Sequence, residues 1–139
     1  MTTSFLYEFI SGYKYGVLST VTVDGLPESA LVGFVITPDL KIFFDTISSS
    51  RKYRNLVNNP ALSFVIGWDS EQTVQYEGSA KISLSDELEE LLPIYFQVFP
   101  DGRERKENWK DLVYFSVEPK WIRYSDFGNP SVIEELRFP

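Results

Sequence analysis

The sequence contains no cysteine and no histidine among its 139 residues. Without cysteine, no disulfide can support the fold. The two absences together remove the usual ligands of zinc, copper and iron–sulfur sites and the commonest axial ligand of haem. They also exclude Ser-His and Cys-His nucleophilic catalysis and the commonest general acid or base. An enzyme of this composition must obtain its chemistry from a cofactor or from Asp, Glu, Lys, Tyr or Arg.

Positive charge is also scarce, because 13 Lys and Arg residues stand against 20 Asp and Glu residues, which gives a net charge of −7. This balance argues against nucleic acid and anionic membranes as main partners, since both require a basic surface. Residues 1–8 carry neither a basic stretch nor a long apolar run, so we expect no signal peptide and no transmembrane span. A cytoplasmic location is the resulting expectation.

Length and composition predict one folded unit. A chain of 139 residues fits a single domain over residues 1–139 and leaves no room for a second of ordinary size. With 43% hydrophobic and 16% aromatic residues, the chain can form a hydrophobic core.

The pattern of apolar residues along the chain predicts a mainly β fold. An Asp24-Gly25 turn joins the first two strands, a bulge is expected at Gly78, and Pro119 should interrupt the last strand. Strands are predicted over 16–23, 28–36, 41–46, 61–67, 72–83 and 112–125. Helices are predicted over 4–11, 50–58 and 85–98, a polar loop over 100–108 and a short acidic tail over 126–139. This order indicates a small antiparallel barrel rather than a parallel βαβ sheet.

Residues 48–54, Ser-Ser-Ser-Arg-Lys-Tyr-Arg, place hydroxyls and three cations where a strand ends and a helix begins. A helix N-terminus already carries partial positive charge and unpaired N–H groups. Cations there are mildly destabilising unless an anion lies among them, and a phosphate would be stabilised by the N–H groups, hydroxyls and cations at once. The alternative is a Ser-capped helix with solvated basic side chains, and the residues alone leave both interpretations open.

Several motifs follow one another in a fixed order: Asp-Gly at 24–25, Pro-Glu-Ser at 27–29, Phe-Phe-Asp-Thr at 43–46, Ser-Arg-Lys at 50–52, Asn-Asn-Pro at 58–60, and Val-Gln-Tyr-Glu-Gly-Ser-Ala-Lys at 74–81. In this order they resemble the pyridoxamine 5′-phosphate oxidase-like family, the FMN-binding split β-barrels. The resemblance covers roughly residues 5–125. It implies a mainly β, antiparallel split β-barrel with peripheral α-helices.

The resemblance also implies bound FMN and assigns residues to it. Arg51 and Lys52 would hold the FMN phosphate, with Ser50 close by. Asp45 and Thr46 would lie beside the ribityl chain and the ring. The remaining implied contacts are with the flavin ring. Four of them, largely through backbone groups, are Ser29, Ala30, Leu31 and Val32, and the next strand would add Thr73 or Gln75.

The chain departs from the true oxidases at their substrate residues. Those enzymes carry an Arg at the position of Ser29, a Lys at that of Phe34, and a C-terminal Trp and Arg-x-His. Here the Trp position holds Ser125 and the chain has no His. We therefore expect FMN binding without oxidation of pyridoxamine phosphate.

The function predicted on this basis is an FMN-binding oxidoreductase that transfers a hydride or electron between the flavin and a small molecule. A homodimer with FMN at the interface is implied by the family and suits a barrel with exposed apolar edges. Alternatives are a non-catalytic flavin-binding or stress-related module, a deazaflavin-dependent reductase on the same fold, a haem binder, which the missing His disfavours, and a structural dimer without ligand. No metal site is expected.

Three further groups of residues invite a functional interpretation. Trp68, Trp109 and Trp121 could stack on a flavin, but we expect core packing or interface burial for each. The carboxylates of 86–90 are expected on a solvated helix face. The basic residues of 103–110 are expected to be solvated, with a second anion site as the alternative.

Overall fold

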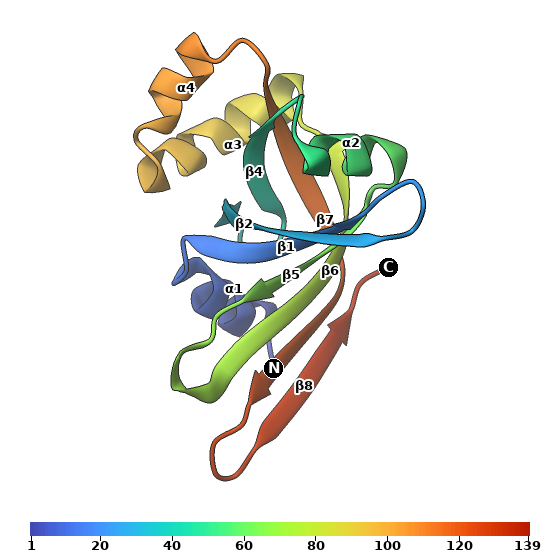
Figure 1. The fold of residues 1–139 in the computed structure, drawn as a ribbon. Helices are drawn as coiled ribbons and strands as arrows, with labels where there is room; N and C mark the ends of the chain where they lie inside the picture. The colour runs from blue at the N-terminus through green and yellow to red at the C-terminus, as the bar shows by residue number, and fades with distance from the viewer.

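A single antiparallel sheet of eight strands forms the body of the protein and curls into a half-open barrel (Figure 1). The computed structural model describes residues 1–139. The strands are β1 (Tyr15–Val21), β2 (Pro27–Gly33), β3 (Val35–Ile36), β4 (Ile42–Ile47), β5 (Ala61–Ile66), β6 (Gln72–Ile82), β7 (Leu112–Asp126) and β8 (Val132–Arg137). They follow the order β2-β1-β5-β6-β7-β4-β3, and β8 pairs with β7 outside this path. The predicted mainly β, antiparallel split barrel is confirmed.

Four α-helices lie around the sheet: α1 (Thr3–Ser11), α2 (Arg51–Asn58), α3 (Ser85–Val98) and α4 (Gly102–Asn108). Figure 1 shows α3 and α4 together at one end of the barrel and α2 beside the β1–β2 hairpin. Helix α1 begins where the Thr2 hydroxyl accepts a hydrogen bond from the Phe5 N–H at 3.0 Å, as expected for an N-cap. None of these helices combines the length and the apolar character required to cross a membrane.

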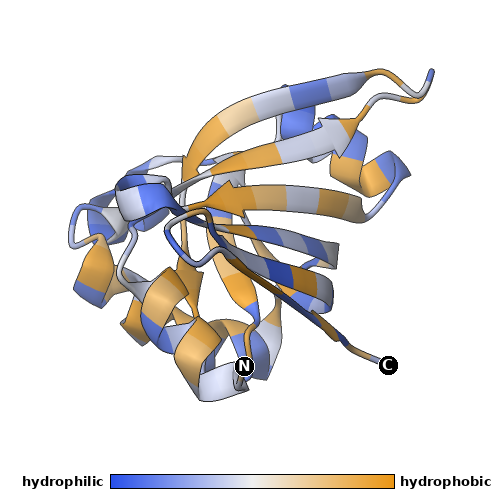
Figure 2. Ribbon diagram, turned by 90° about the horizontal axis from the view of Figure 1, so that it is seen from below, coloured by the Kyte–Doolittle hydropathy of each residue, from blue (hydrophilic) through white to orange (hydrophobic).

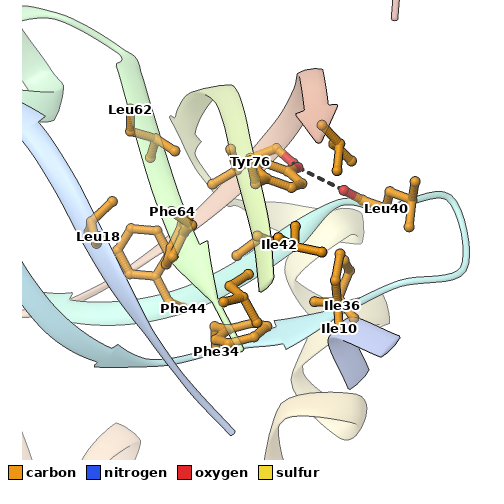
Figure 3. Packing of buried hydrophobic residues seen from close by; sticks show 14 of the residues in the cluster. Ile10, Leu18, Phe34, Ile36, Leu40, Ile42, Phe44, Leu62, Phe64 and Tyr76 are labelled. Atoms are coloured by element: carbon orange, nitrogen blue, oxygen red, sulfur yellow. Dashed lines mark hydrogen bonds between the residues drawn. The ribbon is translucent and has the colours of Figure 1, made fainter. Parts of the chain in front are cut away.

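The inward faces of the strands build the main core, and Figure 2 shows hydrophobic and hydrophilic residues alternating along them. This alternation follows from the two-residue period of a strand, which sends neighbouring side chains to opposite faces. Phe34, Phe44 and Phe64 are fully buried there. The Tyr76 hydroxyl, also buried, donates to the Leu40 carbonyl oxygen at 2.7 Å (Figure 3). The core therefore contains a polar group that is satisfied internally.

A second, smaller cluster joins α3 to the outer side of β4 and β7. The ring of Phe43 stacks on Tyr114 and meets Tyr95 edge-on, with both centroid distances at 5.4 Å. Phe99 at the end of α3 packs so closely on Gly33 that a Cβ there would lie 2.7 Å from the ring. The cluster holds α3 against β4, the strand that precedes α2.

Two elements, α4 and β8, were not predicted, because their sequences lack the regular spacing of apolar residues that marks a helix or strand packed on a core. Residues 102–108 form α4 rather than a polar loop, and residues 132–137, within the predicted short acidic tail, form β8. Every residue of β8 is exposed or half-buried. It is held by backbone pairing to β7, from Trp121 opposite Arg137 to Asp126 opposite Val132. Backbone pairing of this kind leaves little signal in the sequence.

Two long strands also differ from the prediction in their continuity. The segment expected as one strand over 28–36 divides into β2 and β3 at Phe34, whose N–H donates to the Lys14 carbonyl oxygen at 3.0 Å. In contrast, β7 continues through Pro119. The expected bulge at Gly78 is confirmed, because the β6–β7 register shifts between Glu77 and Gly78, and Gly78 then faces Pro119.

The three tryptophans were expected either in the core or at an interface, and two of them do not lie in the core of the single chain. Trp68 is 54% exposed and Trp109 is 52% exposed in the single chain. Trp121 is half-buried on β7, and its indole N–H donates to the Glu135 carboxylate at 3.1 Å.

Candidate functional site

The N-terminus of α2 follows strand β4 after a turn of only three residues. Ser50 caps the helix by accepting a hydrogen bond from the Tyr53 N–H at 3.1 Å. Its hydroxyl also lies 2.8 Å from that of Thr46, a buried residue of β4. This pair of hydroxyls fixes the start of the helix to the barrel wall.

The first turn of α2 leaves hydrogen-bond donors free. The backbone N–H groups of Arg51 and Lys52 have no acceptor in the protein, because Ser50 binds only the N–H groups further along the helix. Such unpaired donors and the helix dipole favour a bound anion at this position. Neither Asp nor Glu stands in this first turn to take that role.

A pocket of about 230 Å³ lies in front of this helix start. Its polar and small lining residues come from three elements: Arg51 and Lys52 of α2, Thr20 of β1, and Glu28, Ser29 and Ala30 of β2. Strand β2 is an edge strand that pairs only with β1, so its other side retains free backbone groups. The pocket thus combines two cations, a helix N-terminus and an unpaired strand edge.

Of the two cations that line the pocket, Lys52 is the more buried, and its burial affects its pKa. Its side chain is half-buried and forms no ion pair with a carboxylate. Burial lowers the pKa of the Lys52 ammonium, while the negative charge of Asp45 acts in the opposite direction. Asp45 itself is paired with Arg105 of α4, with its carboxylate 3.3 Å from Nε. An anion in the pocket would provide Lys52 with the counter-charge that it lacks.

Arg51 is paired with Glu28, a carboxylate that was not among the predicted site residues. The Arg51 guanidinium donates to Oε2 of Glu28. The other oxygen, Oε1, accepts from the Asn55 side-chain amide at 2.8 Å, and the same amide donates to the Thr20 hydroxyl at 3.0 Å. The hydrogen bonds from Arg51 and Asn55 lower the pKa of Glu28. These contacts join residues up to 35 positions apart, so no local motif could have indicated them.

The structure brings the three predicted phosphate-binding residues together with two of the predicted ring contacts. Ser29, Ala30, Arg51 and Lys52 line one pocket, and Ser50 lies at its helix start. Other predicted residues of the same segments face elsewhere. The side chain of Val32 is buried in the core, and that of Asp45 turns toward α4.

Three predicted ring contacts lie on the outer face of the sheet rather than in this pocket. The register places Leu31 opposite Val17, Val17 opposite Val65, and Val65 opposite Gln75. Leu31 and Gln75 therefore stand at opposite ends of one row across four strands, and Thr73 lies two residues away on the same face. Leu31 is 66% exposed and Val65 is 42% exposed. Within one chain, these outer residues and the pocket do not form a single site.

Two of the three positions at which the family resemblance implied oxidase substrate residues, Phe34 and Ser125, are closed to solvent here. Phe34 is 1% exposed, and its ring packs on Phe64 with centroids 5.9 Å apart. Ser125 is 4% exposed within β7, where it pairs with Thr73 and Ile133. Neither position offers a cation to a substrate phosphate.

The strand order and the unclosed barrel define a split-barrel protein, and the start of α2 gives it a candidate anion site. The chain belongs to the pyridoxamine 5′-phosphate oxidase family, whose sequence model matches residues 3–126. The family resemblance found in the sequence is therefore confirmed.

Known proteins of similar sequence or fold carry names that point to different roles, namely stress response, heme binding and FMN binding. General stress protein 26 of Bacillus subtilis is 29% identical over 133 residues, which cover 91% of this chain and 89% of that protein. A heme binding protein from Mycobacterium smegmatis superposes with a TM-score of 0.83 at 16% identity, over 99% of this chain. The chain spans 58% of the length of that protein. A pyridoxamine 5′-phosphate oxidase-related, FMN binding protein from Nostoc punctiforme gives a TM-score of 0.65 at 13% identity, over 91% of this chain and 88% of that one.

Proposed function

We propose that this protein binds FMN with its phosphate at the start of α2. The observation that supports this most strongly is the half-buried Lys52, which has no carboxylate partner and lies beside Arg51 and two free backbone N–H groups. These donors suit a phosphate monoester, whose charge and several oxygens can use all of them at once. The Thr46 and Ser50 hydroxyls fix this arrangement before any ligand arrives.

The edge of β2 would receive the flavin ring in this proposal. Ser29 and Ala30 line the pocket, and the free backbone groups of this edge strand can bond to the polar rim of a planar ring. Leu18 of β1 contributes apolar surface to the same pocket. A small phosphate with a flat aromatic body fits this combination better than a simple inorganic anion.

When bound, FMN would supply hydride or electron transfer, for which the protein needs no histidine or cysteine. The chain's own part would be to bind the phosphate, to orient the ring along β2 and to exclude water from one ring face. We propose that the protein is an oxidoreductase acting on a small molecule in the cytoplasm.

A homodimer is the second part of this proposal. Leu31 and Val65 are exposed and Val17 between them is half-buried, so this row forms an apolar strip on the outer sheet face, adjacent to the β2 edge. A second copy packed on this face would cover the strip. It would also bring the partner's outer residues, such as Gln75, toward the open side of the pocket. The predicted ring contacts in the pocket of one chain and those on the outer face of its partner would then lie together at the interface.

Titration of the purified protein with FMN tests the proposal. We expect saturable binding, a changed flavin absorbance spectrum, and reduction of the bound flavin by NADPH under anaerobic conditions. A parallel titration with hemin should show weaker binding than that of FMN, because the chain has no histidine, the commonest axial ligand of haem. Tight hemin binding without FMN binding would overturn the proposal.

A further inference from the structure

Glu28 places a negative charge inside a pocket whose other ionic side chains are positive. A carboxylate beside a phosphate is repulsive, so its presence needs an explanation. Glu28 is not a loosely placed surface residue. Both of its oxygens are bonded, Oε2 to the Arg51 guanidinium and Oε1 to the Asn55 amide at 2.8 Å.

The Asn55 contact is anchored in the protein interior. Asn55 is only 5% exposed, and its amide also donates to the Thr20 hydroxyl, which is itself buried. The carboxylate of Glu28 is therefore held from behind by a network that joins β1, β2 and α2. Such a network resists displacement, because freeing Glu28 would leave a buried amide without one of its acceptors.

Arg51, in contrast, has little else to hold it. Its side chain is 70% exposed, and the guanidinium bonds to no protein group other than Glu28. A long side chain in this condition would sample many rotamers and would lose that freedom on binding a phosphate. The contact with Glu28 uses one terminal nitrogen, which leaves further guanidinium N–H donors available.

We propose that Glu28 is a positioning residue of the phosphate site, and that it holds the Arg51 guanidinium at the pocket so that the phosphate binds an ordered cation. This inference rests on the proposed FMN function. The ordering effect outweighs the repulsion, because the Arg51 and Asn55 contacts already compensate the Glu28 charge. Glu28 touches neither substrate nor flavin in this role and acts only through Arg51.

The test is the substitution Glu28→Gln, with the dissociation constants of FMN and riboflavin measured by flavin fluorescence. A Gln side chain can keep its carbonyl oxygen on Asn55, but its NH₂ group then faces Arg51 and cannot accept a hydrogen bond. The substitution therefore breaks the Arg51 contact and preserves the buried one. We expect FMN binding to weaken roughly 3- to 10-fold and riboflavin binding to change less than about 2-fold. Glu89→Gln, an exposed site on α3, removes the same charge elsewhere and should change neither.

A double-mutant cycle with Arg51→Ala separates the two levels of the argument. Once Arg51 is gone, Glu28→Gln should no longer weaken FMN binding and should leave it equal or tighter, because the substitution then only removes an uncompensated negative charge beside the phosphate. A general loss of fold would weaken FMN binding in both backgrounds. If Arg51→Ala weakens FMN but Glu28→Gln leaves it unchanged or tightens it, the positioning role is wrong and the phosphate site stands. If Arg51→Ala does not weaken FMN relative to riboflavin, both the phosphate site and the role of Glu28 are wrong. Thermal unfolding of each variant identifies any that fails to fold, and no shift is expected for Glu89→Gln. If Glu28→Gln fails to fold, Glu28→Asp replaces it in the test, because the Asp side chain is too short to keep both contacts. The same loss of FMN affinity is expected for Glu28→Asp.

Discussion

The hydroxyl of Thr46 lies 2.8 Å from that of Ser50, so the end of strand β4 and the cap of helix α2 share one hydrogen bond. This contact fixes where the helix begins and therefore where the free N–H groups of Arg51 and Lys52 point. The same Ser50 oxygen accepts from the Tyr53 N–H at 3.1 Å.

Replacing Ser50 by Ala should destabilise the protein by about 1 kcal/mol, because the helix loses its N-cap acceptor. FMN binding should also weaken, since the helix start is less ordered. Thr46→Val removes the Thr46–Ser50 bond but keeps the cap, so its effect on the free energy of unfolding should be smaller. Urea unfolding of both variants measures the difference. Equal effects would show that the cap does not carry the stabilisation.

Stability should depend on pH through Glu87, which connects α3 to the barrel. Burial opposes its ionisation, but hydrogen bonds from the Ser116 and Ser83 hydroxyls, at 2.7 and 2.8 Å, and the nearby Lys81 lower the pKa of Glu87 below its ordinary 4.5. A lowered folded-state pKa stabilises the protein above the unfolded-state value and loses this effect as the pH falls through the folded-state pKa.

Glu87→Gln should therefore lower the free energy of unfolding at neutral pH and reduce its further fall below about pH 4.5. Urea unfolding at neutral pH and at about pH 3 measures both effects. Glu89→Gln on the same helix serves as the control, because Glu89 is exposed and forms no ion pair. An unchanged pH dependence in Glu87→Gln would contradict the assignment.

The apolar strip on the outer sheet face predicts a dimer near twice the 16.0 kDa chain mass. Glutamate at Leu31 and Val65 would bury charge in the proposed interface, and the double variant should be a monomer by light scattering. Leu84→Glu is a matched control, because Leu84 and Leu31 are both 66% exposed. That variant should remain a dimer. A parent protein that is monomeric with FMN bound would contradict the prediction.

Pyridoxamine 5′-phosphate should not be oxidised. Phe34 is buried in the barrel, where a lysine would stand in a true oxidase, and the chain has no histidine to complete a substrate site. Incubation with FMN and oxygen should give negligible pyridoxal 5′-phosphate. Rapid formation of that product would show that another group binds the substrate phosphate.

The sequence predicted those parts of the fold and site that depend on neighbouring residues. The bounds of α3, Ser85–Val98, match the predicted helix, and Ser50-Arg51-Lys52 lies where a capped helix start was expected. The bulge at Gly78 was also predictable, because a glycine inside a strand pattern is typical of a bulge. The structure shows why a glycine fits there, since a Cβ would lie 2.6 Å from the Glu118 carbonyl oxygen.

Features that depend on distant contacts could not be predicted in this way. Strand β8 is held by backbone pairing, and its residues show no buried face. Glu28 and Asn55 reach the site only because β2 folds beside α2. Strand register decides which predicted ring contacts lie in the pocket and which lie on the outer face. The pattern of residues along the sequence does not determine that register.

The central claim, that Arg51 and Lys52 bind the phosphate of FMN, is tested most directly by comparing FMN with riboflavin. The double variant Arg51→Ala, Lys52→Ala should bind FMN roughly 100-fold more weakly, while riboflavin, which lacks the phosphate, changes less than about 3-fold. Lys106→Ala, Lys110→Ala removes two exposed cations elsewhere and should leave both affinities unchanged. If flavin fluorescence titration shows that the Arg51 and Lys52 variant binds FMN as tightly as the parent, the phosphate site lies elsewhere and the account is wrong.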